Sequence, residues 1–251
     1  MKVFGNRTIR KMTCYHIVYV ICVLAYTIQI IIVIMNGGFF IHCVHVCIVS
    51  FFVFNVIGNM SMFMKTNLNI LATGYEDNVL CEYCKAVVPE GSWHCKKCSI
   101  CVFRRDHHCL GFNRCVGLLN LRYFLLFLGH AYFGLIYGIL HNLVWMFIKF
   151  KINYLLAAKY FLTCVLLYFA IAIFLFLYIG VIFCYHFQNA FMGLTHFDKK
   201  TRKPELKYMK KWRQNLLLVF GVQWYWAMVW PYSYSPIPFY SNKKLLKVVI
   251  I

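Results

Sequence analysis

The segment from Cys81 to Asn120 reads CEYCKAVVPEGSWHCKKCSICVFRRDHHCLGFNRCVGLLN. Ten of the thirty-five residues between Cys81 and Cys115 are cysteine or histidine. They are Cys81, Cys84, His94, Cys95, Cys98, Cys101, His107, His108, Cys109 and Cys115. A CxxC turn places two thiolates on one knuckle, and four thiolates or imidazoles hold a tetrahedral Zn²⁺. Two closed sites would use eight ligands, so two groups would stay free for other chemistry.

The rest of the chain is unusually apolar. Of its 251 residues, 62% are hydrophobic and 13% are charged, which is too apolar for an ordinary soluble domain. Residues 12–64 include no Asp, Glu, Lys or Arg, and a break at Asn36-Gly37-Gly38 divides them into two lengths that can each span a bilayer. Residues 123–148 and 160–197 also lack these charges. The sequence therefore predicts an α-helical polytopic membrane protein with four transmembrane helices; a cleaved signal peptide is disfavoured, because the first apolar run leads directly into another.

The basic residues predict the orientation of the chain. The net charge is +19, and the basic residues gather before the first span, between spans two and three, and after span four. Only Lys149, Lys151 and Lys159 lie between spans three and four. By the positive-inside rule, both termini and the cysteine-rich segment face the cytosol. This reducing compartment favours metal binding or catalysis over disulfides.

These features predict five regions along the chain. They are a cytosolic N-terminus (1–13), transmembrane helices 1 and 2 (14–63), a cytosolic cysteine-rich zinc domain (64–121), transmembrane helices 3 and 4 (122–187), and a cytosolic C-terminal tail with an interfacial segment (188–251). Inside the zinc domain we expect short turns and hairpins, because about 35 residues have too little apolar core and bound zinc supplies folding free energy.

The cysteine and histidine spacing is similar to that of a known family. The pattern CxxC, nine residues, HCxxCxxC, four residues, DHHC, five residues, C resembles the cysteine-rich domain of the DHHC-type (zinc-finger DHHC) protein S-acyltransferases, or palmitoyltransferases, at all ten positions. The resemblance implies two structural Zn²⁺ ions. One would be held by Cys81, Cys84, His94 and Cys101, and the other by Cys95, Cys98, His108 and Cys115. His107 and Cys109 would remain free.

The resemblance also implies an activity, which is protein S-palmitoyl transfer. Cys109 would attack the thioester of a long-chain acyl-CoA, with palmitoyl-CoA as co-substrate, and the acyl group would pass to cytosolic cysteines of membrane-associated protein substrates. His107 would be the base, and Asp106 would orient it. Residues two apart in an extended stretch point to the same side, so His107 can reach Cys109. The enzyme would belong to endomembranes, Golgi or endoplasmic reticulum.

The chain departs from the family pattern at three places. The basic residue that the family often has before the His-Cys pair is missing from Pro89-Glu90-Gly91-Ser92-Trp93. The family usually follows the tetrad with Pro-Trp, where this chain has Leu110-Gly111. Where the family carries Thr-Thr-x-Glu after the last span, this chain has Thr195-His196-Phe197-Asp198. The positions of Tyr208, Asn215 and Gly221 resemble a C-terminal family motif, whose asparagine would support the active site.

The sequence also allows other functions to be considered and predicts roles for residues outside the zinc domain. The replacement of Pro-Trp by Leu110-Gly111 leaves open a second function, in which the protein is a catalytically inactive, membrane-anchored adaptor that uses the zinc domain to bind partners. Nucleic-acid binding is excluded by the four spans and by the missing recognition-helix spacing. His42, Cys43, His45 and Cys47 are expected to be packing residues rather than metal ligands. The basic stretch 199–213 is expected to attract anionic lipid of the bilayer, and residues 215–230 are expected to form the interfacial segment.

Overall fold

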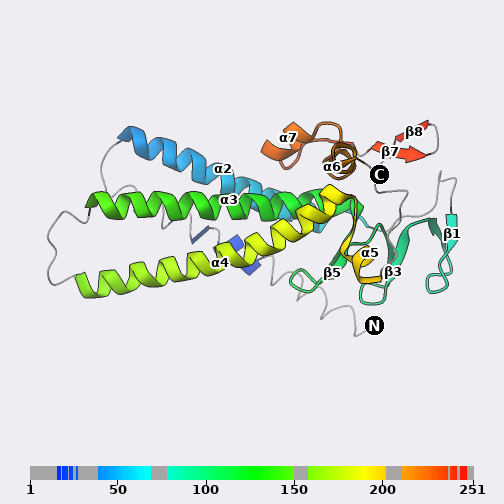
Figure 1. Ribbon diagram of the computed structural model, residues 1–251, viewed down its shortest axis with the longest axis horizontal. Helices are drawn as coiled ribbons and strands as arrows, with labels where there is room; N and C mark the ends of the chain where they lie inside the picture. Colours follow the sequence, from blue (N-terminus) through cyan, green and yellow to red (C-terminus); the bar gives the residue numbers. More distant parts are fainter. Residues whose placement is uncertain are drawn as a thin grey trace.

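The computed structural model describes residues 39–68, 78–149, 158–201, 211–236, 238–241 and 244–247, together with scattered helical positions between 16 and 27. The first expected span, about residues 14–35, therefore lies largely outside the described residues. Three long helices run side by side in Figure 1 and give the molecule its length. They are α2 (Phe39–Lys65), α3 (Leu118–Lys149) and α4 (Ala158–Met192).

Each of these helices has a segment long and apolar enough to cross a membrane. The segments are Cys43–Lys65, Leu118–Val144 and Val165–Met192, and they correspond to the expected spans two, three and four. Large apolar side chains such as Phe174 and Val181 remain well exposed on α4. Water would make so much exposed apolar surface unfavourable, whereas lipid tails would cover it. The described residues thus contain three candidate membrane spans.

The histidines of the second span contribute to helix packing. His45 is buried, its Nδ1 lies 2.9 Å from the Tyr137 hydroxyl oxygen, and its ring stacks on that of His141 with centroids 3.6 Å apart. Cys43 and Cys47 are exposed on the same helix and belong to no cluster of potential metal ligands among the described residues. The prediction of a packing role holds for His45, while the side chain of His42 lies outside the description.

The cysteine-rich segment forms three antiparallel hairpins between α2 and α3, as the sequence predicted. They pair β1 (Asn78–Leu80) with β2 (Val87–Pro89), β3 (Ser92–Cys95) with β4 (Ile100–Phe103), and β5 (His107–Cys109) with β6 (Arg114–Val116). In Figure 1 the hairpins gather at one end of the bundle, where α2 and α4 finish and α3 begins. The polar, cysteine-rich part is therefore segregated from the apolar helices.

The C-terminal part folds back along the bundle. It contains α5 (His196–Thr201), α6 (Trp212–Phe220), α7 (Trp224–Val229) and a hairpin of β7 (Pro238–Ser241) with β8 (Lys244–Lys247). Asn55 donates to the Val229 carbonyl at 3.3 Å, and His130 Nε2 lies 3.0 Å from the Met228 carbonyl oxygen. Asn55 lies ten residues before the end of α2, or about 15 Å along the helix. The end of α7 thus lies beside the long helices rather than beyond them.

One hydrophobic core joins the helices to the third hairpin. Met60 and Phe63 of α2, Phe124 and Leu125 of α3, and Val219 of α6 are buried together in it. Phe112 and Val116 of the hairpin belong to the same core, and Cys109 packs against it. The β5–β6 hairpin is consequently held against the end of the helical bundle.

Candidate functional site

The first two hairpins carry the turns that their cysteine spacing predicts. In each CxxC turn, a backbone amide just after the second cysteine donates to the carbonyl of the first: Lys85 to Cys81 at 2.8 Å, and Ser99 to Cys95 at 2.7 Å. Lys85 and Ser99 both have positive φ, at 54° and 56°. This left-handed residue reverses the chain, so that both thiols of a turn face the same point.

The first cluster brings together Cys81, Cys84, His94 and Cys101. The Nδ1 atom of His94 lies 3.1 Å from the Cys84 sulfur, 3.9 Å from that of Cys101 and 4.0 Å from that of Cys81. The sulfurs of Cys84 and Cys101 are 3.6 Å apart. Zinc bonds of about 2.3 Å to sulfur and 2.0–2.1 Å to nitrogen, arranged tetrahedrally, separate two sulfurs by about 3.8 Å and sulfur from nitrogen by about 3.6 Å. The donor set therefore fits zinc.

The second cluster brings together Cys95, Cys98, His108 and Cys115. The three sulfurs lie 3.6, 3.3 and 3.8 Å from His108 Nδ1, in that order. The other ring nitrogen of His108, Nε2, lies 3.3 Å from Asn113 Oδ1. A hydrogen bond there would fix the tautomer that offers Nδ1 to a metal, which is the usual arrangement for a histidine ligand. Both four-residue sets are those that the sequence predicted, and each could hold one metal ion.

The third hairpin separates the remaining groups from the metal ligands. In β5, His107 pairs with Val116, His108 with Cys115, and Cys109 with Arg114. Because side chains alternate along a strand, His107 and Cys109 lie on one face and His108 on the other. The face with His107 meets the bundle, where the imidazole lies edge-on to the Phe124 ring with centroids 5.4 Å apart.

Asp106, His107 and Cys109 form a connected group. His107 Nδ1 lies 2.7 Å from Asp106 Oδ2, and the Asp106 side chain is 2% exposed. Burial by itself lowers the pKa of His107, but the Asp106 carboxylate and the Cys109 thiol outweigh burial and raise it to about 9. Burial by itself raises the pKa of Cys109, yet hydrogen bonds from His107 and from the backbone of Phe112 and Gly111 leave that pKa below its ordinary value. The arrangement favours a thiolate beside an imidazolium.

A second histidine, His186 of α4, reaches the same carboxylate. Its Nδ1 lies 3.0 Å from Asp106 Oδ2, in an ion-pair contact that does not have the geometry of a hydrogen bond. Burial by itself raises the pKa of Asp106, but the two imidazoles hold it well below its usual range. The sequence by itself did not indicate a role for His186. The available signal was its type, because an ionisable side chain at the end of an apolar span marks a functional position.

The divergent motif Thr195–Asp198 after α4 forms a clamp on Asp106, the residue that precedes β5. The backbone amide of Thr195 donates to Asp198 Oδ2 at 2.8 Å, and the amide of Asp198 donates to Thr195 Oγ1 at 3.0 Å. This reciprocal pair is a capping box at the start of α5. The same turn donates the backbone N–H of His196 to Asp106 Oδ1 at 2.6 Å. A threonine and an acidic residue are therefore sufficient for the clamp.

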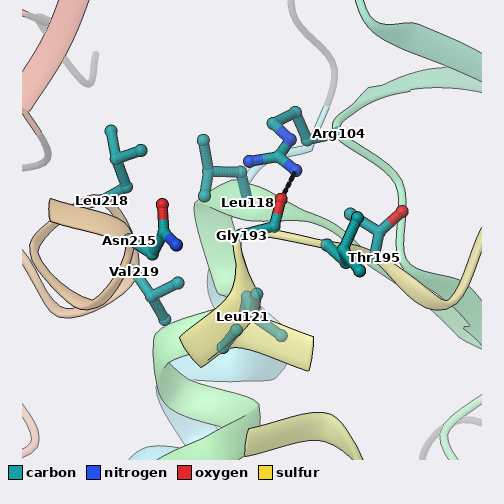
Figure 2. A pocket seen from close by; sticks show the side chains of 10 residues that line it. Arg104, Leu118, Leu121, Gly193, Thr195, Asn215, Leu218 and Val219 are labelled. Carbon is teal, nitrogen blue, oxygen red and sulfur yellow. Dashed lines mark hydrogen bonds between the residues drawn. The ribbon is translucent and has the colours of Figure 1, made fainter. Parts of the chain in front are cut away.

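Arg104 connects this clamp to the hairpins. Its Nη2 donates to the Gly193 carbonyl at 2.8 Å and lies 3.7 Å from Asp198 Oδ2, with both side chains buried. Figure 2 shows the Arg104–Gly193 hydrogen bond beside a cavity of about 20 Å³. This volume is enough for about one water molecule, so the cavity is too small for an acyl chain. Asn215, on the opposite side of the cavity, donates to the Phe191 carbonyl at 2.9 Å and ties α6 to the end of α4.

The residues that replace Pro-Trp lie in the turn between β5 and β6. Leu110 is 69% exposed, and its carbonyl accepts the Asn113 amide at 3.2 Å. A Cβ atom added to Gly111 would meet no atom within 4 Å. The turn therefore does not depend on glycine for space, and the departure leaves the Asp106–His107 contact intact.

A known protein family matches the part of the chain that carries this site. The family model described as DHHC palmitoyltransferase matches residues 74–203, which is more than half of the chain. The chain belongs to the DHHC palmitoyltransferase family. The match begins before the first hairpin and includes α3, α4 and α5, so it covers both Cys/His clusters and the clamp.

Similarity to individual family members is local. The chain is 40% identical to a probable palmitoyltransferase ZDHHC24 of Rattus norvegicus over 83 residues, which are 31% of this chain and 29% of the relative. It is 47% identical to palmitoyltransferase ZDHHC23-B of Danio rerio over 66 residues, 26% of this chain and 15% of the relative. It is 56% identical to palmitoyltransferase swf1 of Schizosaccharomyces pombe over 48 residues, 19% and 14% respectively. The alignments span less than a third of these relatives.

Proposed function

We propose that the protein is a protein S-palmitoyltransferase that uses Cys109 as its nucleophile. The observation that carries this proposal is the separation of roles on β5. His108 faces a complete four-ligand cluster, while His107 and Cys109 occupy the opposite face, with His107 in contact with a buried carboxylate. The remaining groups have the composition of a cysteine–histidine–acid triad.

The reaction would proceed in two thioester exchanges. In the first, the Cys109 thiolate attacks the carbonyl carbon of the acyl-CoA, a new carbon–sulfur bond forms, and the bond to the CoA sulfur breaks. His107 would hold the proton of the thiol and deliver it to the departing CoA thiolate. In the second exchange, His107 would take the proton of a substrate cysteine, whose sulfur attacks the acyl group and releases Cys109. One thioester replaces another in each step, so no other co-reactant is needed.

Zinc would have a structural role. The two four-residue clusters would each hold one Zn²⁺, and the bound ions would supply folding free energy to hairpins that have little apolar core. Four protein donors complete a tetrahedron in each cluster, which is typical of closed structural sites. The clusters would thereby fix the register of β5 and the direction in which Cys109 points.

The membrane arrangement extends the proposal. With four spans, both termini and the cysteine-rich zinc domain would face the cytosol, as the distribution of basic residues predicts. The hairpins would then lie on the cytosolic surface of an endomembrane. The contact of Cys109 with the core at the end of the helices supports this placement, because an acyl chain could lie among the helices while its thioester reaches the thiol. Protein substrates would present their cysteines from the cytosol.

The test is covalent labelling of the purified chain with an alkyne analogue of palmitoyl-CoA. We expect hydroxylamine-sensitive label on the wild type and none on Cys109→Ser, with two zinc ions per chain in both. If neither protein is labelled while zinc is retained, the proposed activity is wrong and the adaptor interpretation replaces it. The exposed Cys184 offers a matched control, because Cys184→Ser should label like the wild type.

A further inference from the structure

We propose that His186 is a positioning residue for the Asp106–His107 pair, so that the last turns of α4 take part in organising the active site. The proposal rests on the function proposed for Cys109. Three contacts carry it. His186 Nδ1 lies 3.0 Å from the Asp106 oxygen that also meets His107, the two imidazole rings stack, and both rings meet the same phenylalanine.

The shared carboxylate oxygen is the first contact. Asp106 Oδ2 lies between His107 Nδ1 at 2.7 Å and His186 Nδ1 at 3.0 Å, while Oδ1 accepts the backbone N–H of His196 at 2.6 Å. The carboxylate is therefore held from three directions, by His107 of β5, by α4 and by the start of α5. A carboxylate fixed at both oxygens cannot rotate to a second position without losing contacts.

Ring packing is the second contact. The centroids of His107 and His186 are 4.8 Å apart, with 27° between the ring planes. Phe124 of α3 presents its ring at 67° to that of His107 and at 86° to that of His186, with a centroid distance of 5.4 Å in both pairs. The imidazole of His107 thus has His186 on one side and Phe124 at another, and these neighbours restrict its χ2 rotation. Restricting that rotation would hold the His107 imidazole in the orientation that contacts Asp106.

The position of His186 in the chain explains what it would add. His107 and Asp106 lie on a short hairpin, where a displacement of about 1 Å could reduce a reaction rate by about 100-fold. His186 lies on a long helix that packs against α3 and α6. A rigid helix positions a group more precisely than a loop does. His186 would transfer this rigidity to the catalytic pair.

Three substitutions separate the contacts that His186 makes. In His186→Asn, the amide nitrogen can occupy the place of Nδ1 and stay beside Asp106 while the ring is lost. In His186→Gln, the amide nitrogen falls near the place of Nε2, so the side chain keeps a donor but directs it elsewhere. His186→Phe retains a ring against His107 and has no donor. Each variant is compared in a Cys184→Ser background, which removes an exposed thiol two residues away.

The first measurement does not depend on acyl transfer. The rate of Cys109 alkylation by iodoacetamide is followed by mass spectrometry of its peptide, with zinc content measured in parallel. We expect His186→Gln, which keeps neither the ring nor the position of Nδ1, to slow alkylation about 10- to 100-fold, and His186→Asn and His186→Phe, which each keep one of the two contacts, to slow it less. All variants should retain two zinc ions per chain and a similar unfolding temperature.

The second measurement is the rate of autoacylation against acyl-CoA concentration. A positioning role predicts that the maximal rate falls in His186→Gln and His186→Phe, while the acyl-CoA concentration for half-maximal rate is unchanged. Wild-type alkylation rates in both variants would overturn the proposal. Equal losses in all three variants, accompanied by zinc loss or a lower unfolding temperature, would reduce His186 to a structural residue and also overturn it. Altered alkylation with no acylation of the wild type would support the positioning role and refute the proposed function.

Discussion

The clamp between Arg104 and Asp198 offers a sharp test, because one charge change removes several contacts. In Asp198→Asn the Arg104 guanidinium stays buried but loses the carboxylate 3.7 Å away. The capping box is weakened as well, since Asp198 Oδ2 accepts the Thr195 amide at 2.8 Å. The turn that donates the His196 amide to Asp106 would then be held less firmly.

The magnitude follows from the burial of the pair. The two side chains are 8% and 7% exposed. Removing one partner of a buried ion pair destabilises a protein by about 3–5 kcal/mol. Arg104 keeps its hydrogen bond to the Gly193 carbonyl, so we take the lower end, about 3 kcal/mol. In a chain of this size each kcal/mol lowers the unfolding temperature by about 2–4 °C, which gives about 6–12 °C.

The assay is thermal unfolding of the detergent-solubilised protein, with Cys109 alkylation measured at a temperature where each variant is folded. Glu82→Gln removes the same charge from an exposed position and should leave the unfolding temperature within about 1 °C of the wild type. Replacing both partners, as Arg104→Met with Asp198→Leu, should recover part of the loss, because no charge is left buried alone. An unfolding temperature of Asp198→Asn equal to that of Glu82→Gln would refute the reasoning.

Three further predictions concern the metal clusters and the backbone. Cys81→Ala should release one zinc ion per chain and unfold the first hairpins, whereas Cys109→Ser should keep both ions; zinc loss from Cys109→Ser in metal analysis would contradict the division of ligands. In Asn113→Gly, glycine tolerates the φ of 46° at this position, but the acceptor for His108 Nε2 is lost. We expect the zinc affinity of the second cluster to fall about 10- to 100-fold in chelator competition. An unchanged affinity would show that Asn113 does not support the site. Gly221→Ala should lower stability by about 2 kcal/mol in thermal unfolding, because φ is 81° and the added Cβ would lie 2.3 Å from Ser235 Oγ; a neutral result would mean that this turn can shift.

The cysteine and histidine spacing, together with its resemblance to the DHHC family, predicted most of the candidate site. Metal ligands and a nucleophile must be particular residue types at short, fixed separations. The possible chemistry of a hairpin-forming segment can therefore be predicted from its sequence. The alternation along β5 was predictable for the same reason, because it depends only on the period of a strand. The apolar runs likewise predicted the three described membrane-length helices, since helix length and hydropathy follow from composition.

Contacts between distant segments could be found only in the tertiary structure. His186 lies 80 residues from Asp106 in the chain, and nothing local to α4 indicates that its ring meets that carboxylate. The Thr195–Asp198 motif likewise looked incomplete against the family pattern, yet a capping box needs only a hydroxyl and a carboxylate three residues apart. The sequence, through its spacing and its resemblance to the family, predicted which groups would react and which would bind metal, because these roles depend on residue type and short spacing. The packing of α4 and α5 against the hairpins decided how those groups are held, because that packing depends on how the whole bundle buries its apolar faces.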